Sequence, residues 1–159
     1  MIIQTIVDSN YSVSSLAVLP NGNFASGSFK QIKLYQKNNK TWILKRIFDE
    51  TGIINSLAIF PNGDFASGSK SKITIYESKT QNVKQIISDF DHYVQILVTL
   101  PSGELAIGTN NGLIEIINSS GNVRSSLKAH SKSVTSLALL SNGKLASGSD
   151  DRSIKIWDV

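Results

Sequence analysis

The sequence contains no cysteine, which excludes disulfide bonds, thiolate nucleophiles and cysteine-ligated zinc. Its longest purely apolar runs are a few residues long, whereas a transmembrane helix needs about 20. The first ten residues, MIIQTIVDSN, lack the basic leader and the long apolar run of a secretory signal. These absences favour a reducing compartment, so we expect a cytoplasmic protein with no membrane association.

Acidic residues are scarce in the first half of the chain. Residues 1–84 contain ten Lys or Arg and five Asp or Glu, whereas residues 85–159 contain six and seven. The basic residues that lie close together are Lys30, Lys33, Lys37, Lys40, Lys45 and Arg46. This cluster makes a polyanion one candidate partner. The alternative interpretation is a solvated face of a strand-rich unit.

One motif of ten residues occurs four times along the chain. Its copies are LPNGNFASGS from Leu19, FPNGDFASGS from Phe60, LPSGELAIGT from Leu100 and LSNGKLASGS from Leu140. The turn glycines Gly22, Gly63, Gly103 and Gly143 are separated by 41, 40 and 40 residues. Such a period indicates copies of one supersecondary unit. We expect a single domain, residues 1–159, with units at approximately 1–35, 36–76, 77–117 and 118–157.

Each unit has the pattern of four short antiparallel strands. In the first unit VSSLAVL is β-rich, Asn-Gly supplies a tight turn, and FASGS, IKLY and TWILKRIF follow with polar turns between them. Apolar residues occupy both parities of the inner strands, so both faces of each small sheet must be buried. Sheets packed face to face around an axis satisfy this requirement. The sequence therefore predicts an all-β protein, a β-propeller of four-stranded antiparallel blades with four repeats in this chain.

The last unit, HSKSVTSLALLSNGKLASGSDDRSIKIWDV, resembles a WD repeat over almost its full length, and the other three resemble degenerate WD repeats. The resemblance implies a structural hydrogen-bond chain in the last blade that joins His130, Ser147, Asp151 and Trp157. The tryptophan is replaced in the other units by Tyr35, Tyr76 and Ile117. We therefore expect the other units to depend on packing alone.

Residues 2–7 hold the position of an outermost strand, and the chain ends after a third strand, so we expect residues 2–7 to complete the last blade. The resemblance implies a ring of about seven or eight blades, more than four repeats provide. A homodimer that closes an eight-bladed ring would satisfy this number, each chain supplying half of the ring. An open or fragmentary half-ring and a closed four-bladed ring are the alternatives.

The sequence gives little support for catalysis or metal binding. His130, Ser147 and Asp151 are the residue types of a hydrolytic triad, but the resemblance gives them a buried structural role. Asp89, Asp91 and His92 lie in one connecting loop, and we interpret them as solvated loop residues rather than metal ligands. We expect no enzyme activity, no cofactor and no metal.

The resemblance implies that partners bind the face formed by the loops before the first strands and by the second hairpins. The candidates on this top face are Tyr11, Phe29, Lys30, Lys70, Tyr93, Asn111 and Arg152. Aromatic residues and arginine dominate interface energetics, and Phe29 at a hairpin tip is the sharpest candidate. We therefore predict a non-catalytic scaffold that binds a peptide or protein through this face. The alternative is an RNA- or phosphate-binding propeller that uses the basic first blade.

Overall fold

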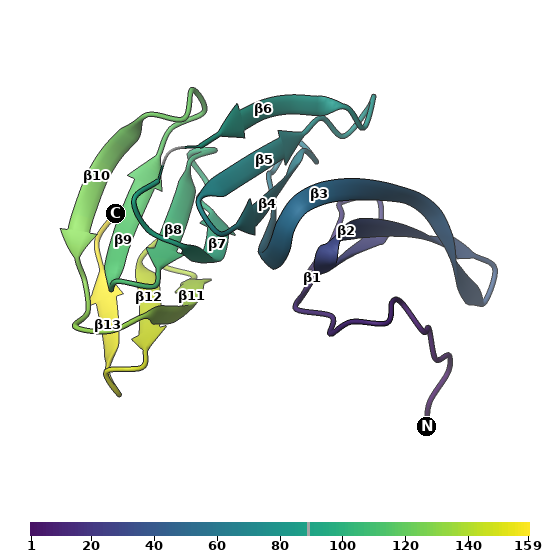
Figure 1. Ribbon diagram of the computed structural model, residues 1–159, viewed down its shortest axis with the longest axis horizontal. Coiled ribbons are helices and arrows are strands. Elements are labelled where there is room, and N and C mark those ends of the chain that lie inside the picture. Colours follow the sequence, from purple (N-terminus) through teal and green to yellow (C-terminus); the bar gives the residue numbers. More distant parts are fainter. Residues whose placement is uncertain (89) are drawn as a thin grey trace.

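The computed structural model describes residues 1–88 and 90–159, and these residues form strands and turns without any helix (Figure 1). The strands of the first two units are β1 (Ser15–Val18), β2 (Phe24–Asn38), β3 (Thr41–Ile59), β4 (Phe65–Ser69), β5 (Lys72–Tyr76) and β6 (Val83–Ile87). Those of the last two are β7 (Val94–Thr99), β8 (Leu105–Thr109), β9 (Leu113–Ile117), β10 (Val123–Lys128), β11 (Val134–Leu139), β12 (Leu145–Ser149) and β13 (Ile154–Trp157). The predicted all-β class is confirmed.

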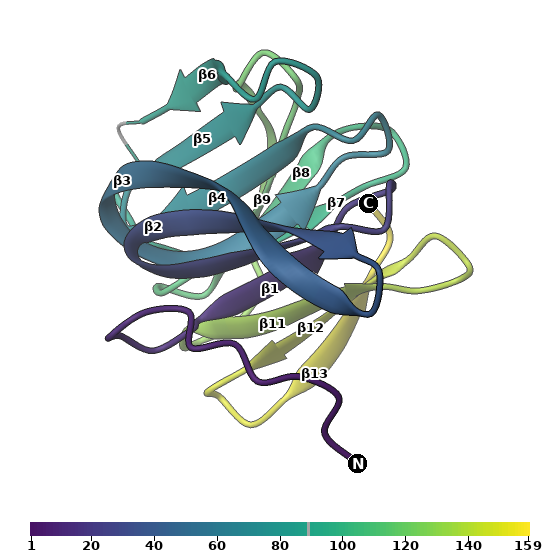
Figure 2. The same ribbon diagram turned by 90° about the vertical axis from the view of Figure 1, so that its right-hand side faces the viewer.

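The strands pair in antiparallel sheets that follow the chain order. β1 to β6 form a six-stranded sheet, β7 to β10 a four-stranded sheet and β11 to β13 a three-stranded sheet. The sheets lie around an arc, with β1 near one end and β13 near the other (Figure 1). Figure 2 shows the same arc from the end that carries β1, β2 and the N-terminus.

Two long strands explain why the first two units share one sheet. Phe24 and Tyr35 in β2 would be about 36 Å apart in a straight strand, yet their rings stack with centroids 4.8 Å apart. β2 therefore folds back on itself near Lys30, which has a φ of 58°. β3 pairs with β2 through residues 41–49 and with β4 through residues 54–59, so it continues from the first unit into the second.

A tight turn joins the first two strands of each unit. In the first unit the Gly22 N–H donates to the Leu19 carbonyl over 2.9 Å, and Gly22 has a φ of 80°. The equivalent glycines with the same hydrogen bond and a positive φ are Gly63, Gly103 and Gly143. A positive φ is costly for a residue with a Cβ, so the spacing of these glycines marks the turns in the sequence.

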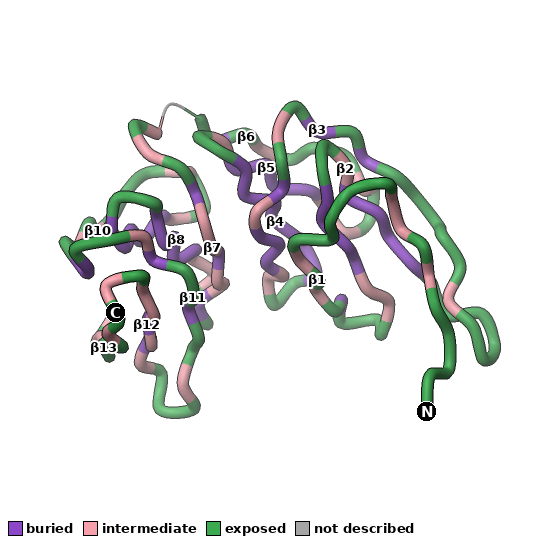
Figure 3. Tube along the Cα trace, turned by 60° about the horizontal axis from the view of Figure 1, so that its bottom comes forward, coloured by how far each residue is buried: buried purple, intermediate pink, exposed green. Residues whose placement is uncertain are grey.

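Successive units pack face to face, with a glycine at each point of closest approach. A Cβ at Gly27 would lie 2.7 Å from Ile54 Cγ2 of the next unit. The later pairs in the same relation are Gly68 with Val94 and Gly108 with Val134. Each junction between units has its own apolar cluster, and buried stretches run through the facing strands in Figure 3.

The N-terminal segment lies against the first unit rather than the last. Residues 2–7 form no strand, and the Gln4 side chain exchanges two hydrogen bonds with the Trp42 backbone, at 2.7 and 2.9 Å. Within one copy this segment does not complete the sheet of β11 to β13, because the first and last sheets lie at opposite ends of the arc. Completion of the last sheet by residues 2–7 stays a prediction.

Candidate functional site

The loops before the first strand of each unit and the second hairpins lie at one end of the sheets. This follows from the antiparallel pairing of the first two strands in every unit, since one strand begins where the next one ends. We call this end the loop face. It carries all the predicted partner-binding residues, Tyr11, Phe29, Lys30, Lys70, Tyr93, Asn111 and Arg152.

The last unit brings together the four residues of the expected hydrogen-bond chain. His130 Nδ1 lies 2.8 Å from Asp151 Oδ2, and His130 Nε2 lies 2.7 Å from Ser147 Oγ. The Trp157 indole N–H donates to Ser147 Oγ over 2.8 Å. A carboxylate only accepts, so the His130 Nδ1–H donates to Asp151 and the Nε2 accepts from the Ser147 hydroxyl. Each polar side-chain atom of these four residues therefore has a hydrogen-bond partner.

This Asp–His–Ser arrangement has the distances of a hydrolytic triad but not its access to substrate. Ser147 is 1% exposed, and its hydroxyl oxygen already accepts from Trp157. Several hydrogen bonds lower the pKa of Asp151. The bond from the Ser153 hydroxyl has the largest effect, and the bond from His130 also contributes. The ionised carboxylate also accepts from the Ser131 and Ser153 N–H groups. It thus joins the loop before β11 to the hairpin before β13.

The second unit builds an equivalent cluster around a residue that we did not predict. Glu50 precedes Ile54 by four residues, as His130 precedes Val134. Its Oε1 accepts from the Ser67 hydroxyl at 2.7 Å and the Tyr76 hydroxyl at 2.8 Å, and its Oε2 pairs with Lys72 Nζ at 2.6 Å. The expectation that this unit depends on packing alone is wrong, because a carboxylate and a tyrosine together replace the histidine and the tryptophan.

The Glu50 cluster holds its charges in fixed states. Burial raises the pKa of Glu50, but the hydrogen bonds from Lys72, Ser67 and Tyr76 outweigh it and lower the pKa below the ordinary value. Burial, aided by the charge of Glu50, raises the pKa of Tyr76, so its hydroxyl remains a donor. The register of Glu50 relative to Ile54 was the signal in the sequence that could have revealed it.

The first unit uses Asp8 in the same way. Asp8 Oδ1 accepts from the Ser26 hydroxyl at 2.7 Å and from the Tyr35 hydroxyl, and Lys33 Nζ donates to the Asp8 carbonyl. Asp8 lies five residues before Val13 rather than four, so register alone does not point to it. The packing-only expectation is therefore wrong for the first unit as well.

The third unit does replace the cluster by apolar side chains. Ile107 and Ile117 stand at the positions of Ser147 and Trp157, both are fully buried, and Phe90 packs against the same apolar cluster at the register of His130. When all the polar members of such a cluster are replaced together, no member remains without its hydrogen-bond partner. His92 was interpreted as a surface histidine, which is wrong: its side chain is 9% exposed and lies 3.2 Å from Glu115.

The most prominent feature of the loop face is an aromatic pair. The rings of Tyr11 and Phe29 have centroids 4.6 Å apart, although 58% and 36% of the two residues remain exposed. Lys30 Nζ lies 5.3 Å from the Phe29 ring centroid. The pair borders a groove of about 690 Å³ that Asp8, Lys33, Asp49 and Glu50 also line. Phe29 thus packs on a loop residue of its own unit and keeps an open side.

The other predicted loop-face residues lie on later units. Lys70 Nζ is 5.8 Å from the Tyr93 ring centroid, which joins the second unit to the third. Asn111 accepts a hydrogen bond from the Thr109 hydroxyl at 2.6 Å, so its side chain is engaged within its own hairpin. Arg152 is exposed at the tip of the last hairpin and has a φ of 71°.

The structure disperses the basic cluster of the first unit. Lys33 is buried and bound to Asp8, so it cannot contact a polyanion on the surface. Lys30 lies at the fold-back of β2, whereas Lys37 pairs with Trp42 near the far end of that strand. These seven residues of strand span about 23 Å. The basic residues therefore do not form one continuous patch.

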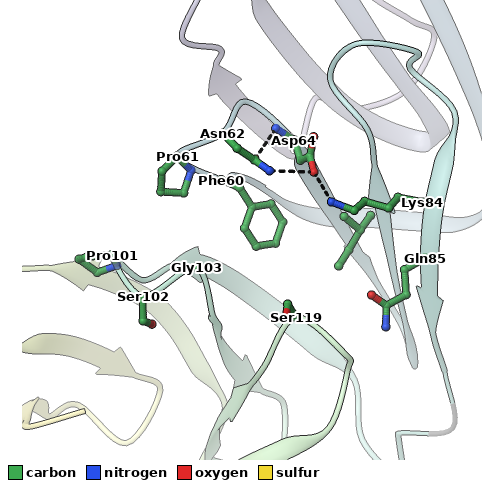
Figure 4. A pocket seen from close by; sticks show the side chains of 11 residues that line it. Phe60, Pro61, Asn62, Asp64, Lys84, Gln85, Pro101, Ser102, Gly103 and Ser119 are labelled. Carbon is green, nitrogen blue, oxygen red and sulfur yellow. Dashed lines mark hydrogen bonds and ion pairs between the residues drawn. The ribbon is translucent and has the colours of Figure 1, made fainter.

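The end of the sheets opposite the loop face carries a smaller pocket that the sequence did not reveal. It has a volume of about 310 Å³ and lies between the turn segments of the second and third units (Figure 4). Phe60, Pro61 and Pro101 form its apolar wall. Asp64 lies at its edge and is bound to Lys84 Nζ at 2.7 Å and to the Asn62 amide at 3.1 Å. Both of these charged groups are thus engaged within the protein.

The described residues contain no cluster of three or more His, Asp or Glu side chains that could hold a metal ion. Asp89, one of the loop residues considered for metal binding, lies outside the described residues. No helix in the described part of the chain is long and apolar enough to cross a membrane.

Part of the chain matches a known protein family. Residues 121–158 match the family model WD40, described as WD domain, G-beta repeat. The matched segment runs from the turn before β10 to the end of β13 and contains the cluster of His130, Ser147, Asp151 and Trp157. It is consistent with the predicted WD-repeat family and supports a β-propeller. WD40 repeats generally mediate protein–protein interactions. No curated protein matches the chain.

Proposed function

We propose that the chain is a β-propeller scaffold of four-stranded blades that binds a peptide or protein through its loop face and catalyses no reaction. The aromatic pair of Tyr11 and Phe29 is the observation that carries this proposal. Exposed aromatic surface is costly in water, and aromatic side chains supply most of the binding energy at many interfaces. The adjoining groove gives a peptide side chain a place to bind.

Two hairpin tips of the loop face carry cationic side chains. Lys30 and Arg152 adopt left-handed backbone conformations, with φ of 58° and 71°. Such a conformation costs a residue with a Cβ about 1 kcal/mol or more, and because Asn39 and Gln81 adopt it at hairpins away from the loop face, it reflects tight turns that fix the direction of the two side chains. Both strained residues carry long cationic side chains beside the loop-face surface. We infer that these cations contribute contacts to a partner.

No observation favours the alternative of RNA or phosphate binding by the first blade. Lys33 is engaged with Asp8, and Lys30 and Lys37 are separated along β2. A polyanion tracks a continuous basic surface, and its affinity falls steeply as salt rises. The test of the scaffold proposal therefore includes binding of a polyanion as a contradicting outcome.

A random peptide library displayed on phage, panned against the immobilised chain, tests the proposal. Enriched peptides should bind the wild-type protein and lose about tenfold or more of their affinity with Phe29→Ala. The matched control is Leu44→Ala, which removes an exposed apolar side chain from β3, 48% exposed compared with 36% for Phe29. Peptides that bind wild type and Phe29→Ala equally would contradict the proposal. So would the absence of peptide binding combined with salt-sensitive binding of oligouridine.

A further inference from the structure

The two ends of the arc present apolar faces that include positions buried in every other unit of the chain. Leu16 of β1 is 68% exposed, whereas the matching residues Leu57, Leu97 and Leu137 are 8% exposed or less. Ile154 of β13 is 79% exposed, whereas the matching residues Ile32, Ile73 and Ile114 are fully buried. We call Val13, Leu16 and Val18 the entry face, and Gly148, Ile154 and Ile156 the exit face.

The internal junctions show what covers each kind of face. At every junction the residue equivalent to Val13 packs on the glycine equivalent to Gly148, with Ile54, Val94 and Val134 in turn against Gly27, Gly68 and Gly108. A Cβ at Gly148 would meet only the Ser136 side chain of its own sheet within 4 Å. The same interface between units therefore occurs three times within the chain. At each end of the arc one of its two faces is exposed.

Polar groups repeat across the first two junctions as well, whereas Ile96 takes the place of the serine at the third. The Leu57 N–H donates to Ser15 Oγ at 2.9 Å, and the Leu97 N–H donates to Ser56 Oγ at 3.0 Å. Ser136 holds the position of Ser15 and Ser56 in the last unit and is exposed. Its geometric counterpart is the Leu16 N–H of another first unit. The open faces thus match in shape, apolarity and hydrogen bonding.

We propose that the entry face of one copy docks on the exit face of a second copy, and reciprocally, in a two-fold dimer that closes a ring. Val13 would pack on Gly148 of the second copy, and the Leu16 N–H would donate to its Ser136 Oγ. The arrangement covers all four open faces with an interface that the chain already makes internally. It also closes on itself, which avoids the open filament that head-to-tail contacts otherwise produce.

Light scattering coupled to size-exclusion chromatography measures the assembly directly. The 159-residue chain should have twice the monomer mass of 17.3 kDa. Leu16→Asp should return the mass to the monomer value with an unchanged far-UV circular dichroism spectrum, because Leu16 is 68% exposed within one copy. Ile86→Asp is the matched control: Ile86 is 56% exposed on β6, away from both faces, so that variant should remain dimeric.

Cysteine cross-linking tests which faces meet, and the chain has no cysteine of its own. An ideal Cβ at Gly27 lies 3.2 Å from Ile54 Cβ, a few tenths of an ångström closer than the separation of about 3.5–4.5 Å in a disulfide, so a small outward shift of the two strands would allow the bond. A Val13→Cys chain mixed with a Gly148→Cys chain should form a covalent dimer on oxidation, and neither chain alone should do so. A mass of 17.3 kDa at all concentrations, a ladder of larger species, or equal cross-linking of each chain alone would overturn the proposal. A dimer that forms without the mixed disulfide would overturn the assignment of the faces.

Discussion

The Tyr76 hydroxyl donates a 2.8 Å hydrogen bond to the Glu50 carboxylate, in the place where the last unit joins Trp157 to His130 through Ser147. Two different sets of residues thus make equivalent hydrogen-bonded connections within their sheets. Each set connects the segment before the first strand of a unit to the second and third strands of the same sheet, and in the second unit this segment is part of β3. Because these segments lie at the loop face, the buried clusters hold in place the surface that we propose to bind partners.

Glu50→Gln should lower the free energy of unfolding by about 2 kcal/mol. The amide removes the ion pair with Lys72, and its nitrogen cannot accept the hydrogen bonds that the carboxylate accepts. Urea denaturation measures the change. Asp158→Asn is the control, since its pair with Lys144 is exposed and should contribute about 0.5 kcal/mol or less. Equal midpoints for the two variants would contradict the role given to Glu50.

The stabilisation by Glu50 should depend on pH in one direction. Its pKa is lowered by folding, so its contribution is complete above the ordinary pKa of glutamate, about 4.3, and is lost as the pH falls below that value. The difference in unfolding free energy between wild type and Glu50→Gln should therefore be constant from neutral pH to about pH 5 and should narrow below pH 4. A constant difference throughout would show that Glu50 is not ionised in the folded protein.

Trp157→Ala should destabilise the protein by about 2–3 kcal/mol, less than for a fully buried aromatic side chain, because Trp157 is only half-buried. Trp157→Phe keeps an aromatic ring and removes the hydrogen bond to Ser147, so it should cost about 1 kcal/mol. Thermal melting of both variants provides the ranking. Melting of Trp157→Ala at the wild-type temperature would rule out the packing role.

The regular parts of the fold were predictable because they depend on local constraints. Glycine spacing marked the turns, and alternating apolar residues marked sheets with two buried faces. The polar turn expected between FASGS and IKLY is the fold-back of β2, whereas the continuation of β3 through Gly52 into the second unit was not predicted, because a glycine usually weakens or ends a strand. The cluster of His130, Ser147, Asp151 and Trp157 could be named because its residues match the family motif.

The remaining site residues depend on distances that sequence does not give. Glu50 had the right register but the wrong residue type for the motif, and Asp8 was displaced by one position. Tyr11 and Phe29 meet only because a loop and a hairpin converge at the same end of the sheet. Lys30 and Lys37 are close in sequence, but an extended strand carries them apart.

The central claim is that each sheet is stabilised by close face-to-face packing on its neighbours, and Gly68→Ala tests it most directly. The new Cβ would lie 2.7 Å from Val94 Cγ1 and 3.1 Å from Leu97 Cδ1, both in the next unit. Gly52→Ala is the matched control, because its Cβ would meet only ordinary contacts with Ser69. In urea denaturation, Gly68→Ala should lose about 1–3 kcal/mol of stability and Gly52→Ala almost none. Unfolding of Gly68→Ala at the wild-type urea midpoint would contradict the claim.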